Sequence, residues 1–257
     1  MPTQLNTTEL EAKVKDMYRH VAEQPERDYH FELGRPLARR LGYPEDDLNR
    51  IPDGAIESFA GVGYFFDLAA LERGESVLDL GSGSGMDAFF AAGKVGDPGR
   101  VVGVDMTDEQ LAKARRLAGV AGLDQVEFVA ARIEELPLED AAFDIVISNG
   151  VINLSPEKER VFAEVARVLR PGGRLAVADI VSEKQLTESI VCDASLWASC
   201  IGGAAQQDDY QQAIGDAGLA IDEVRENPYE FISDQARNAS AKYGVKSVSL
   251  LARKPAP

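Results

Sequence analysis

The sequence predicts an α/β fold in which one mostly parallel, seven-stranded sheet carries helices on both faces. Five short apolar runs end in glycine or in small polar or acidic residues, and helical patterns separate them, which is the alternation of βαβ units. Two further apolar runs near the C-terminus supply the remaining strands. The 257 residues, of which 45% are hydrophobic and 27% charged, suit one globular core.

Residues 1–70 are expected to form a helical leader that acts as a lid. A second short helix is expected over Arg35–Leu41. The stretch 42–53 contains two prolines and predicts turns, and 58–64 contains two glycines and predicts a loop that reaches the body. The apolar residues at helical spacing in the first helix are Leu10, Val14, Met17, Tyr18 and Val21.

The second expected domain, residues 71–257, begins with the alternating body. Thr107 is expected to cap a helix, and Pro171-Gly172-Gly173 to stop the helix before the fifth strand. Because crossovers of this kind are right-handed, the predicted arrangement is Rossmann-like. The expected strands are 77–80, 101–104, 126–129, 145–147 and 175–178, and the expected helices between them are 87–95, 108–121 and 156–169.

After Asp179 the alternation is interrupted. Residues 183–205 are expected to form a helical cap insertion, and another helix is expected over 208–218. The strands 221–225 and 245–252 complete the predicted sheet.

Charge and composition exclude several classes of function. The chain has 43 acidic and 27 basic residues, and its net charge of −16 repels nucleic acid and anionic membranes. No apolar run is long enough to span a bilayer. The two cysteines and the lack of a signal-peptide pattern favour a reducing cytoplasm. We therefore expect a cytoplasmic protein that acts on a small molecule, without a metal, and we leave a homodimer open.

The strongest local motif is the glycine-rich turn after the first strand, Gly81-Ser82-Gly83-Ser84-Gly85. Glycines at this place let a ligand approach the backbone closely, and the pattern would also suit a dinucleotide. Asp79, just before the first glycine, repels a pyrophosphate but attracts the sulfonium and ammonium of S-adenosylmethionine (SAM). The motif therefore favours SAM over NAD.

Polar residues also follow the next three strands. Asp105 can accept both hydroxyls of a ribose, and Met106 can pack against an adenine face. Ile133 and Glu134 suit the face and the amino group of adenine, although a plain loop explains them equally well. Asn149 ends the fourth strand at the crevice where open α/β sheets hold ligands.

Together these motifs resemble the class I SAM-dependent methyltransferases, and most of all the branch of the arsenite and ubiquinone-biosynthesis C-methyltransferases. The resemblance covers roughly residues 60–205 and is carried by 80–87, 103–107, 149–154 and 169–173, with 196–204 specific to the arsenite enzymes. It implies that Gly81, Ser82 and Gly83 line the methionine part of SAM, that Asp105 holds the ribose, that Met106, Ile133 and Glu134 frame adenine, and that Asn149 lies near the methyl donor.

The sequence departs from this branch at the substrate cysteines. The arsenite enzymes bind trivalent arsenic through three cysteines, and the matching positions here hold Val62, Gly150 and Cys200. One thiol cannot form a three-coordinate site. Cys200 is a candidate catalytic thiol at the substrate pocket, with an inert buried thiol as the alternative.

The remaining candidates come from the leader and the cap. His30 is suited to proton transfer near neutral pH and, with Tyr29, is a candidate catalytic residue, with a structural role as the alternative. Trp197 stands one helical turn before Cys200 and would either wall an apolar pocket or belong to the core. Arg35 and Asn153 complete the candidate substrate-binding residues.

The expected function is transfer of a methyl group from SAM to a small-molecule nucleophile, favouring a soft one such as a thiol, a sulfide, or a selenium or arsenic species. The protein would hold the acceptor about 3–3.5 Å from the methyl carbon and exclude water. The alternatives are C- or O-methylation of an aromatic or isoprenoid-type molecule, a non-catalytic SAM-binding module, and an NAD-dependent oxidoreductase.

Overall fold

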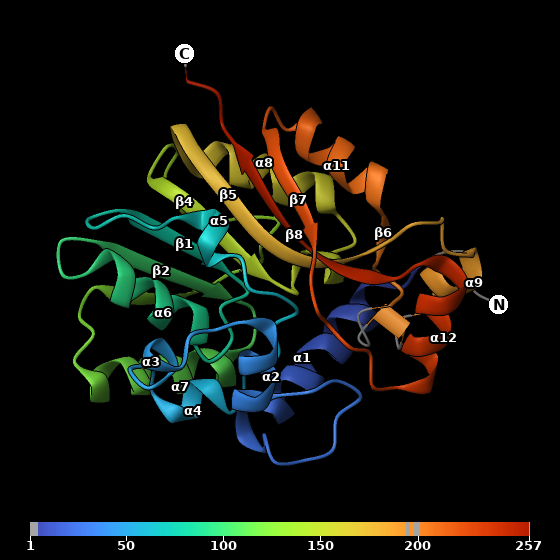
Figure 1. The fold of residues 1–257 in the computed structure, drawn as a ribbon, viewed down its shortest axis with the longest axis horizontal. Helices are drawn as coiled ribbons and strands as arrows, with labels where there is room; N and C mark the ends of the chain where they lie inside the picture. Colours follow the sequence, from blue (N-terminus) through green and yellow to red (C-terminus); the bar gives the residue numbers. More distant parts are fainter. Residues whose placement is uncertain (1–4, 194–195, 198–200, 257) are drawn as a thin grey trace.

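The computed structural model describes residues 5–193, 196–197 and 201–256. Its centre is one sheet in the order β3-β2-β1-β4-β5-β8-β7, with the two-residue β6 paired to β5 off this path (Figure 1). The neighbours from β3 to β5 are parallel, whereas β8 runs antiparallel to β5 and β7. The Rossmann-like fold predicted from the sequence is confirmed.

The predicted strands and body helices are all present, with small shifts at their ends. The strands are β1 (Ser76–Leu80), β2 (Arg100–Asp105), β3 (Val126–Ala130), β4 (Phe143–Asn149), β5 (Leu169–Ser182), β6 (Ala205–Gln206), β7 (Ala220–Glu226) and β8 (Lys246–Arg253). The helices are α1 (Thr7–Glu23), α2 (Gly34–Leu41), α3 (Glu45–Leu48), α4 (Asp53–Ile56), α5 (Phe66–Ala69), α6 (Met86–Val95), α7 (Asp108–Ala121), η1 (Ile152–Leu154), α8 (Lys158–Val168), α9 (Glu188–Val191), α11 (Gln207–Asp216) and α12 (Asp234–Tyr243).

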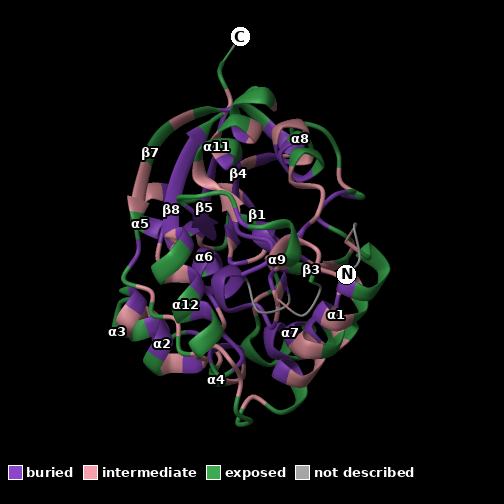
Figure 2. Cartoon of the chain, turned by 90° about the vertical axis from the view of Figure 1, so that its right-hand side faces the viewer, coloured by how far each residue is buried: buried purple, intermediate pink, exposed green. Residues whose placement is uncertain are grey.

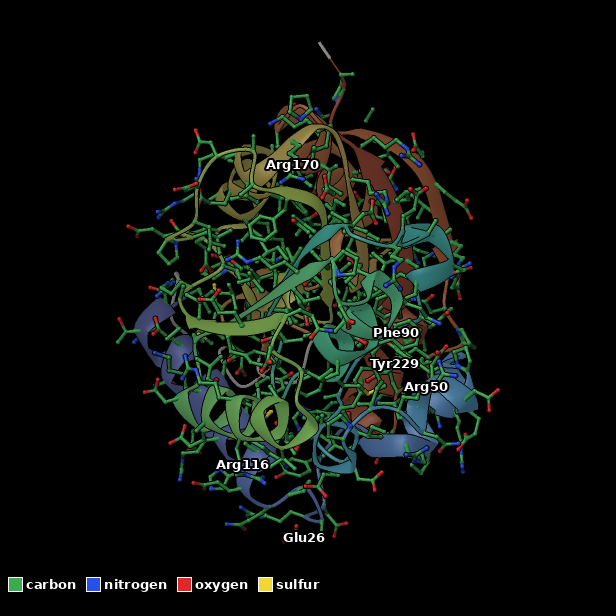
Figure 3. The ribbon with its side chains drawn as sticks, turned by 90° about the vertical axis from the view of Figure 1, so that its left-hand side faces the viewer. Glu26, Arg50, Phe90, Arg116, Arg170 and Tyr229 are labelled. Atoms are coloured by element: carbon green, nitrogen blue, oxygen red, sulfur yellow. The ribbon has the colours of Figure 1, made fainter. Side chains whose placement is uncertain are left out.

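The sheet separates two layers of core. Successive strand residues point to opposite faces, so Val77 joins the cluster of α6 and the leader while Leu78 joins the cluster of α8 and α11. Figure 2 shows the strands buried between helices whose outer faces are exposed. Charged side chains project outward around this body, as Figure 3 shows for the labelled Glu26, Arg116 and Arg170.

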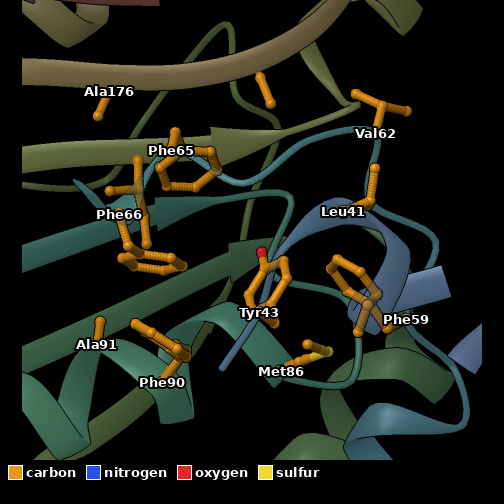
Figure 4. Close-up of a cluster of buried hydrophobic side chains, with 14 of the residues drawn as sticks. Leu41, Tyr43, Phe59, Val62, Phe65, Phe66, Met86, Phe90, Ala91 and Ala176 are labelled. Carbon is orange, nitrogen blue, oxygen red and sulfur yellow. The ribbon is translucent and has the colours of Figure 1, made fainter. Parts of the chain in front are cut away.

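The leader packs against the body through an aromatic cluster. The ring of Tyr43 lies edge-on to those of Phe59, Phe66 and Phe90, with centroids 5.3, 6.1 and 5.6 Å away (Figure 4). Further along, α1 lies against α7, where the amide of Gln110 donates to the carbonyl of Tyr18 at 2.8 Å. These contacts hold the leader over the edge where β1, β2 and β4 end.

Four local predictions were wrong. The stretch 42–53 contains the short helix α3 as well as turns, and Pro171-Gly172-Gly173 lies within the long strand β5. The insertion 183–205 is not helical throughout, because it ends in β6. The sequence patterns also missed α12, whose buried side chains are few and mostly small. No helix among the described residues is both long and apolar enough to cross a membrane.

Candidate active site

The candidate site is a pocket at the carboxyl ends of β1, β2 and β4. The strand order reverses beside β1, which has β2 on one side and β4 on the other. Open α/β sheets bind ligands at such a switch point. The pocket holds about 1150 Å³ of empty space, and residues from the leader, the strand ends and η1 line it. Small-molecule sites usually hold about 300–1,000 Å³, so this pocket has room for a cofactor and a small acceptor.

The glycine-rich turn after β1 forms the floor of the pocket. Gly81, Gly83 and Gly85 have φ values of 69°, 52° and 94°, in the left-handed region that other residues rarely adopt. A Cβ at Gly81 would collide with the side chain of Val151, so this glycine also allows close packing. The prediction of a tight turn that brings backbone to the pocket is therefore confirmed.

Asp79 is buried in this floor, with only 2% of its surface exposed. Its Oδ2 atom and the hydroxyl of Ser82 have no hydrogen-bond partner among the described residues, although both residues line the pocket. Burial raises the pKa of Asp79 well above its usual value, and the nearby charges of Asp87 and Asp105 add to this rise. Buried polar atoms of this kind fit a ligand that brings a cationic donor.

Asp105, at the end of β2, is held by the backbone. Its Oδ1 accepts a hydrogen bond from the N–H of Thr107 at 2.8 Å, and its Oδ2 accepts one from Gly83 at 2.9 Å. Burial raises the pKa of Asp105, while these hydrogen bonds act in the opposite direction. Each carboxylate oxygen can accept two hydrogen bonds, so both can still take a hydroxyl from a ribose.

The residues predicted to frame adenine lie together on one side of the pocket. Met106, Ile133 and Glu134 all line it. The hydroxyl of Ser155 donates to Glu134 at 2.5 Å and ties the loop after β3 to the loop after η1. The wall is therefore built from three separate segments of the chain.

Asn149 lines the pocket, but its side-chain amide is fully used inside the protein. Its Oδ1 accepts from the N–H groups of Val62 and Gly63 at 2.7 and 3.3 Å. Its Nδ2 donates to the carbonyl of Gly63 at 3.0 Å, to the hydroxyl of Tyr43 at 3.1 Å and to Asp87 at 2.9 Å. The structure thus gives Asn149 the task of holding the leader loop.

Sequence reasoning missed Tyr43 and Asp87. The hydroxyl of Tyr43 donates to Asp87 at 2.6 Å, and both side chains are buried. Burial raises the pKa of Asp87 to about 6, and the hydrogen bonds from Tyr43 and Asn149 oppose that rise. Asp87 was identified only as the start of a helix, and no pattern around Tyr43 distinguishes it from other core aromatic residues.

The leader forms one wall of the pocket, as its predicted position as a lid requires. Leu10, Val14 and Tyr18 of α1 line the pocket. Glu11, from the same helix, forms an ion pair with Arg132 of the opposite wall. The first helix therefore contacts both sides of the site.

The candidate residues of the leader lie elsewhere. Tyr29 and His30 line a separate surface groove beside α1, where the Tyr29 hydroxyl donates to the carbonyl of Gln24 at 2.9 Å. Arg35 pairs with Glu45 and Asp53, each at 3.1 Å. The structure does not bring these three side chains to the pocket, because α1 separates the groove of Tyr29 and His30 from it and acidic neighbours hold Arg35.

The cap candidates divide in the same way. Trp197 is buried and packs with Leu10, Val14 and Leu154, so it lies behind the pocket wall as part of a core cluster. Asn153 is buried beside it and does not line the pocket. Cys200 lies outside the residues that the structure describes.

The two positions that hold cysteines in the resemblance are neighbours here. A Cβ at Gly150 would lie 3.1 Å from Cγ1 of Val62. Gly150 has φ 73°, which disfavours a larger residue. Val62 is 2% exposed and is part of the core. An apolar contact therefore stands where two thiols would face each other.

A family model described as a methyltransferase domain matches residues 71–218, more than half of the chain. The chain belongs to the methyltransferase domain family. SAM is the cofactor that this membership implies, and the buried carboxylate of Asp79 with the open hydroxyl of Ser82 suits its cationic end. The resemblance stated from the sequence is confirmed, and a small-molecule substrate is the class that such a domain implies.

Several relatives of this methyltransferase have names that indicate an acceptor. The chain is 41% identical to an arsenite methyltransferase of Halobacterium salinarum over 85% of its own length and 56% of the relative. It is 36% identical to the methyltransferase GfsG of Streptomyces halstedii, covering 81% of the chain and 76% of the relative. Among solved structures, the arsenic(III) SAM methyltransferase CrArsM of Chlamydomonas reinhardtii matches with 31% identity and a TM-score of 0.65, over 88% of this chain and 75% of that one. The chain spans about half the length of the arsenite methyltransferases that it matches.

Proposed function

We propose that this methyltransferase transfers the methyl group of SAM to a small, soft, uncharged nucleophile, with a trivalent arsenic species as the first candidate. The observation that carries the SAM half is the buried Asp79, whose Oδ2 lies at the pocket without an internal partner. The kinship with arsenite methyltransferases favours the arsenic species.

The residues at the strand ends would hold the cofactor. Asp79 and Ser82 would take the ammonium of its methionine part, and Asp105 the ribose hydroxyls. Met106, Ile133 and Glu134 would surround adenine, while Gly81 and Gly83 let the cofactor lie against the backbone. SAM brings the activated methyl group, so the chain's own task is to position the acceptor and to exclude water.

The charge of the pocket favours a neutral acceptor. Its described lining includes five carboxylic acids, namely Glu11, Asp79, Asp87, Asp105 and Glu134. Arg132 is the cation of that lining, and it pairs with Glu11 and Glu134. A field of this sign repels phosphate or carboxylate groups on an acceptor and attracts the cationic cofactor.

The acceptor side of the pocket is apolar rather than thiol-lined among the described residues. Phe59, Gly61 and Gly150 line it, and Val62 packs behind Gly150. Such a surface holds a soft acceptor by dispersion and size. An acceptor that arrives with its own thiolate ligands would need fewer bonds from the protein.

Asp87 is the described group best placed to accept a proton from an acceptor that arrives protonated. It lines the pocket, and its pKa of about 6 leaves it ionised at neutral pH. The net charge of −16 supports a small molecule over nucleic acid as the substrate. The cytoplasmic location and a homodimer remain predictions from the sequence.

The test is a methyl-transfer screen with radiolabelled SAM and arsenite, selenite, sulfide, small thiols and quinols. Turnover on arsenite, selenite or sulfide, retained by Arg35→Ala and lost in Asp79→Asn, supports the proposal. Turnover on a quinol alone would instead indicate carbon methylation, to which the 41% identity with a ubiquinone/menaquinone biosynthesis C-methyltransferase of Enterobacter sp. over 45% of the chain gives some weight. SAM binding without turnover on any acceptor would contradict the enzymatic half of the proposal.

Cys200 is tested in the same assay. Turnover that survives Cys200→Ser shows that the thiol is not needed for the reaction, and turnover that disappears while SAM still binds gives the thiol a direct role in holding the acceptor.

A further inference from the structure

A lysine and a tryptophan meet behind the pocket wall. The Nζ atom of Lys158, at the start of α8, lies 4.8 Å from the centroid of the Trp197 ring. The same Nζ donates to the carbonyls of Asn153 and Ser155 at 3.2 and 2.8 Å. The ammonium therefore binds the end of η1 and the face of a cap residue at the same time.

Trp197 in turn supports side chains that line the pocket. It packs in one cluster with Leu10, Val14 and Leu154, all of which line the pocket. Its indole N–H donates to the carbonyl of Val191 at 2.6 Å, which fixes the ring within the cap. The position of the ring thus determines how the α1 wall and the η1 wall meet.

The loop that Lys158 binds also forms part of the pocket. Leu154, Ser155 and Pro156 line it, and Ser155 donates to Glu134 on the predicted adenine side. Withdrawing the ammonium would leave two carbonyls of this loop without that donor. A change at Lys158 would therefore reach the cofactor wall through the loop as well as through Trp197.

A glycine allows the cap to approach this closely. A Cβ on Gly203 would collide with the carbonyl oxygen of Asn153, and it would lie 2.7 Å from Cε3 of Trp197. The same carbonyl accepts the hydrogen bond from Lys158. Cap, η1 and lysine therefore meet at one point.

We propose that Lys158 is a positioning residue that docks the cap, through Trp197, onto the wall of the SAM pocket. The inference rests on the proposed function only for what the pocket binds, since the contact itself exists without a ligand. Carboxylates face the ammonium from three sides, namely Asp179 of β5, Glu159 of α8 and Glu134 of the loop after β3, and the Tyr210 hydroxyl of α11 donates to Asp179 at 2.9 Å. Desolvation lowers the pKa of Lys158 to about 8, and these carboxylates oppose that change.

The chain offers a matched control. Lys254 is also partly buried, and its Nζ donates to two carbonyls at the end of α8, those of Ala166 and Leu169, at 2.7 and 2.8 Å. Among the described residues no aromatic ring lies over it, and it is far from the pocket lining. Lys158→Met and Lys254→Met thus remove the same kind of helix-end contact, and only the first changes the cap.

Trp197 is the single tryptophan of the chain, so its fluorescence reports the contact directly. In the protein without ligand, we expect wild-type emission to change with a midpoint near pH 8 and this transition to be absent in Lys158→Met. Lys158→Met should also shift the emission to longer wavelength at pH 7 and weaken SAM binding about tenfold in calorimetric titration. Lys254→Met should match the wild type in both measurements.

Gly203→Ala is the second variant, because it keeps the lysine but blocks the approach of the cap. It should reproduce the emission shift and the weaker SAM binding of Lys158→Met. Unchanged emission in both variants, or equal losses of SAM affinity in the Lys158 and Lys254 variants, would overturn the proposal. If the wild type binds no SAM at all, the proposed function fails, while the fluorescence comparison still decides the role of Lys158.

Discussion

The ends of β1 and β4 lie side by side in the sheet, yet their polar residues are used in opposite ways. Asp79, at the end of β1, keeps a buried oxygen without an internal partner. Asn149, at the end of β4, spends its whole side-chain amide on the leader loop, Tyr43 and Asp87. A buried polar atom left open at a pocket indicates a ligand contact, whereas a saturated one indicates a structural joint. The pocket therefore combines a cofactor floor with a leader that is hinged on Asn149.

Asn149→Ala should give the largest effect on stability. It removes the partners of two backbone N–H groups and leaves Asp87 with one hydrogen bond fewer in a buried place. We expect a loss of about 2–4 kcal/mol and a melting midpoint lower by roughly 5–15 °C. Ser148→Ala is the control, because it removes one buried hydrogen bond from the same strand end and should cost only about 1 kcal/mol. Equal midpoints for the two variants would mean that Asn149 does not anchor the leader.

Asp79→Asn should act on binding rather than on folding. It removes the charge that would meet the ammonium of SAM, so affinity should fall about 30- to 100-fold, or roughly 2–3 kcal/mol. Because burial disfavours the ionised form of Asp79, the unliganded variant should melt at or above the wild-type temperature. Calorimetric titration and thermal melting of both proteins check this pair of results. A variant that melts lower and still binds SAM as the wild type does would reverse the assignment of the two strand ends.

The pH dependence of SAM binding sharpens the same contrast. Burial raises the pKa of Asp79 and that of Asp87, the latter to about 6, so both carboxyls gain protons as the pH falls toward 5. The cation of SAM binds the ionised form, so affinity should rise severalfold from pH 5 to pH 7 with release of protons. In the unliganded protein the sign is opposite, because the stability that a raised pKa supplies is present below pH 4 and is lost as the pH rises through 6. Titrations in buffers of different ionisation enthalpy measure the protons released, and a pH-independent affinity would contradict the placement of these carboxylates.

The smallest effect is expected outside the pocket. Arg35→Ala removes exposed ion pairs with Glu45 and Asp53, and such pairs contribute about 0–1 kcal/mol. SAM affinity should stay within twofold of the wild type in this variant and in His30→Gln. A tenfold loss of SAM affinity in either variant would restore the leader residues to the site from which the structure separates them.

The sequence predicted the part of the site that is local in the chain. Asp79, Asp105 and the glycines were found because each follows a recognisable strand, and parallel strands bring their ends together. The role of Asn149 was not visible, because Tyr43 and the loop at Gly63 are distant in sequence and meet it only through tertiary packing. His30 was chosen for its chemistry alone, without knowledge of which side of α1 it faces.

The fold shows the same division. The periodicity of the body predicted its strands and helices, whereas α12 has the buried side chains Ala236, Ala239 and Tyr243, which make too weak an apolar stripe to detect. Lys158 gave no signal either, since its partners are backbone carbonyls and a ring from the cap. What depends on contacts between distant segments had to come from the structure.

Titration of the wild-type protein with SAM, and in parallel with NADH, tests most directly that the open polar atoms of the β1 floor form a SAM site. We predict one SAM bound per chain, with loss of that binding in Asp79→Asn and no binding of NADH. NADH binding, or the absence of any heat with SAM, would contradict the assignment of this pocket.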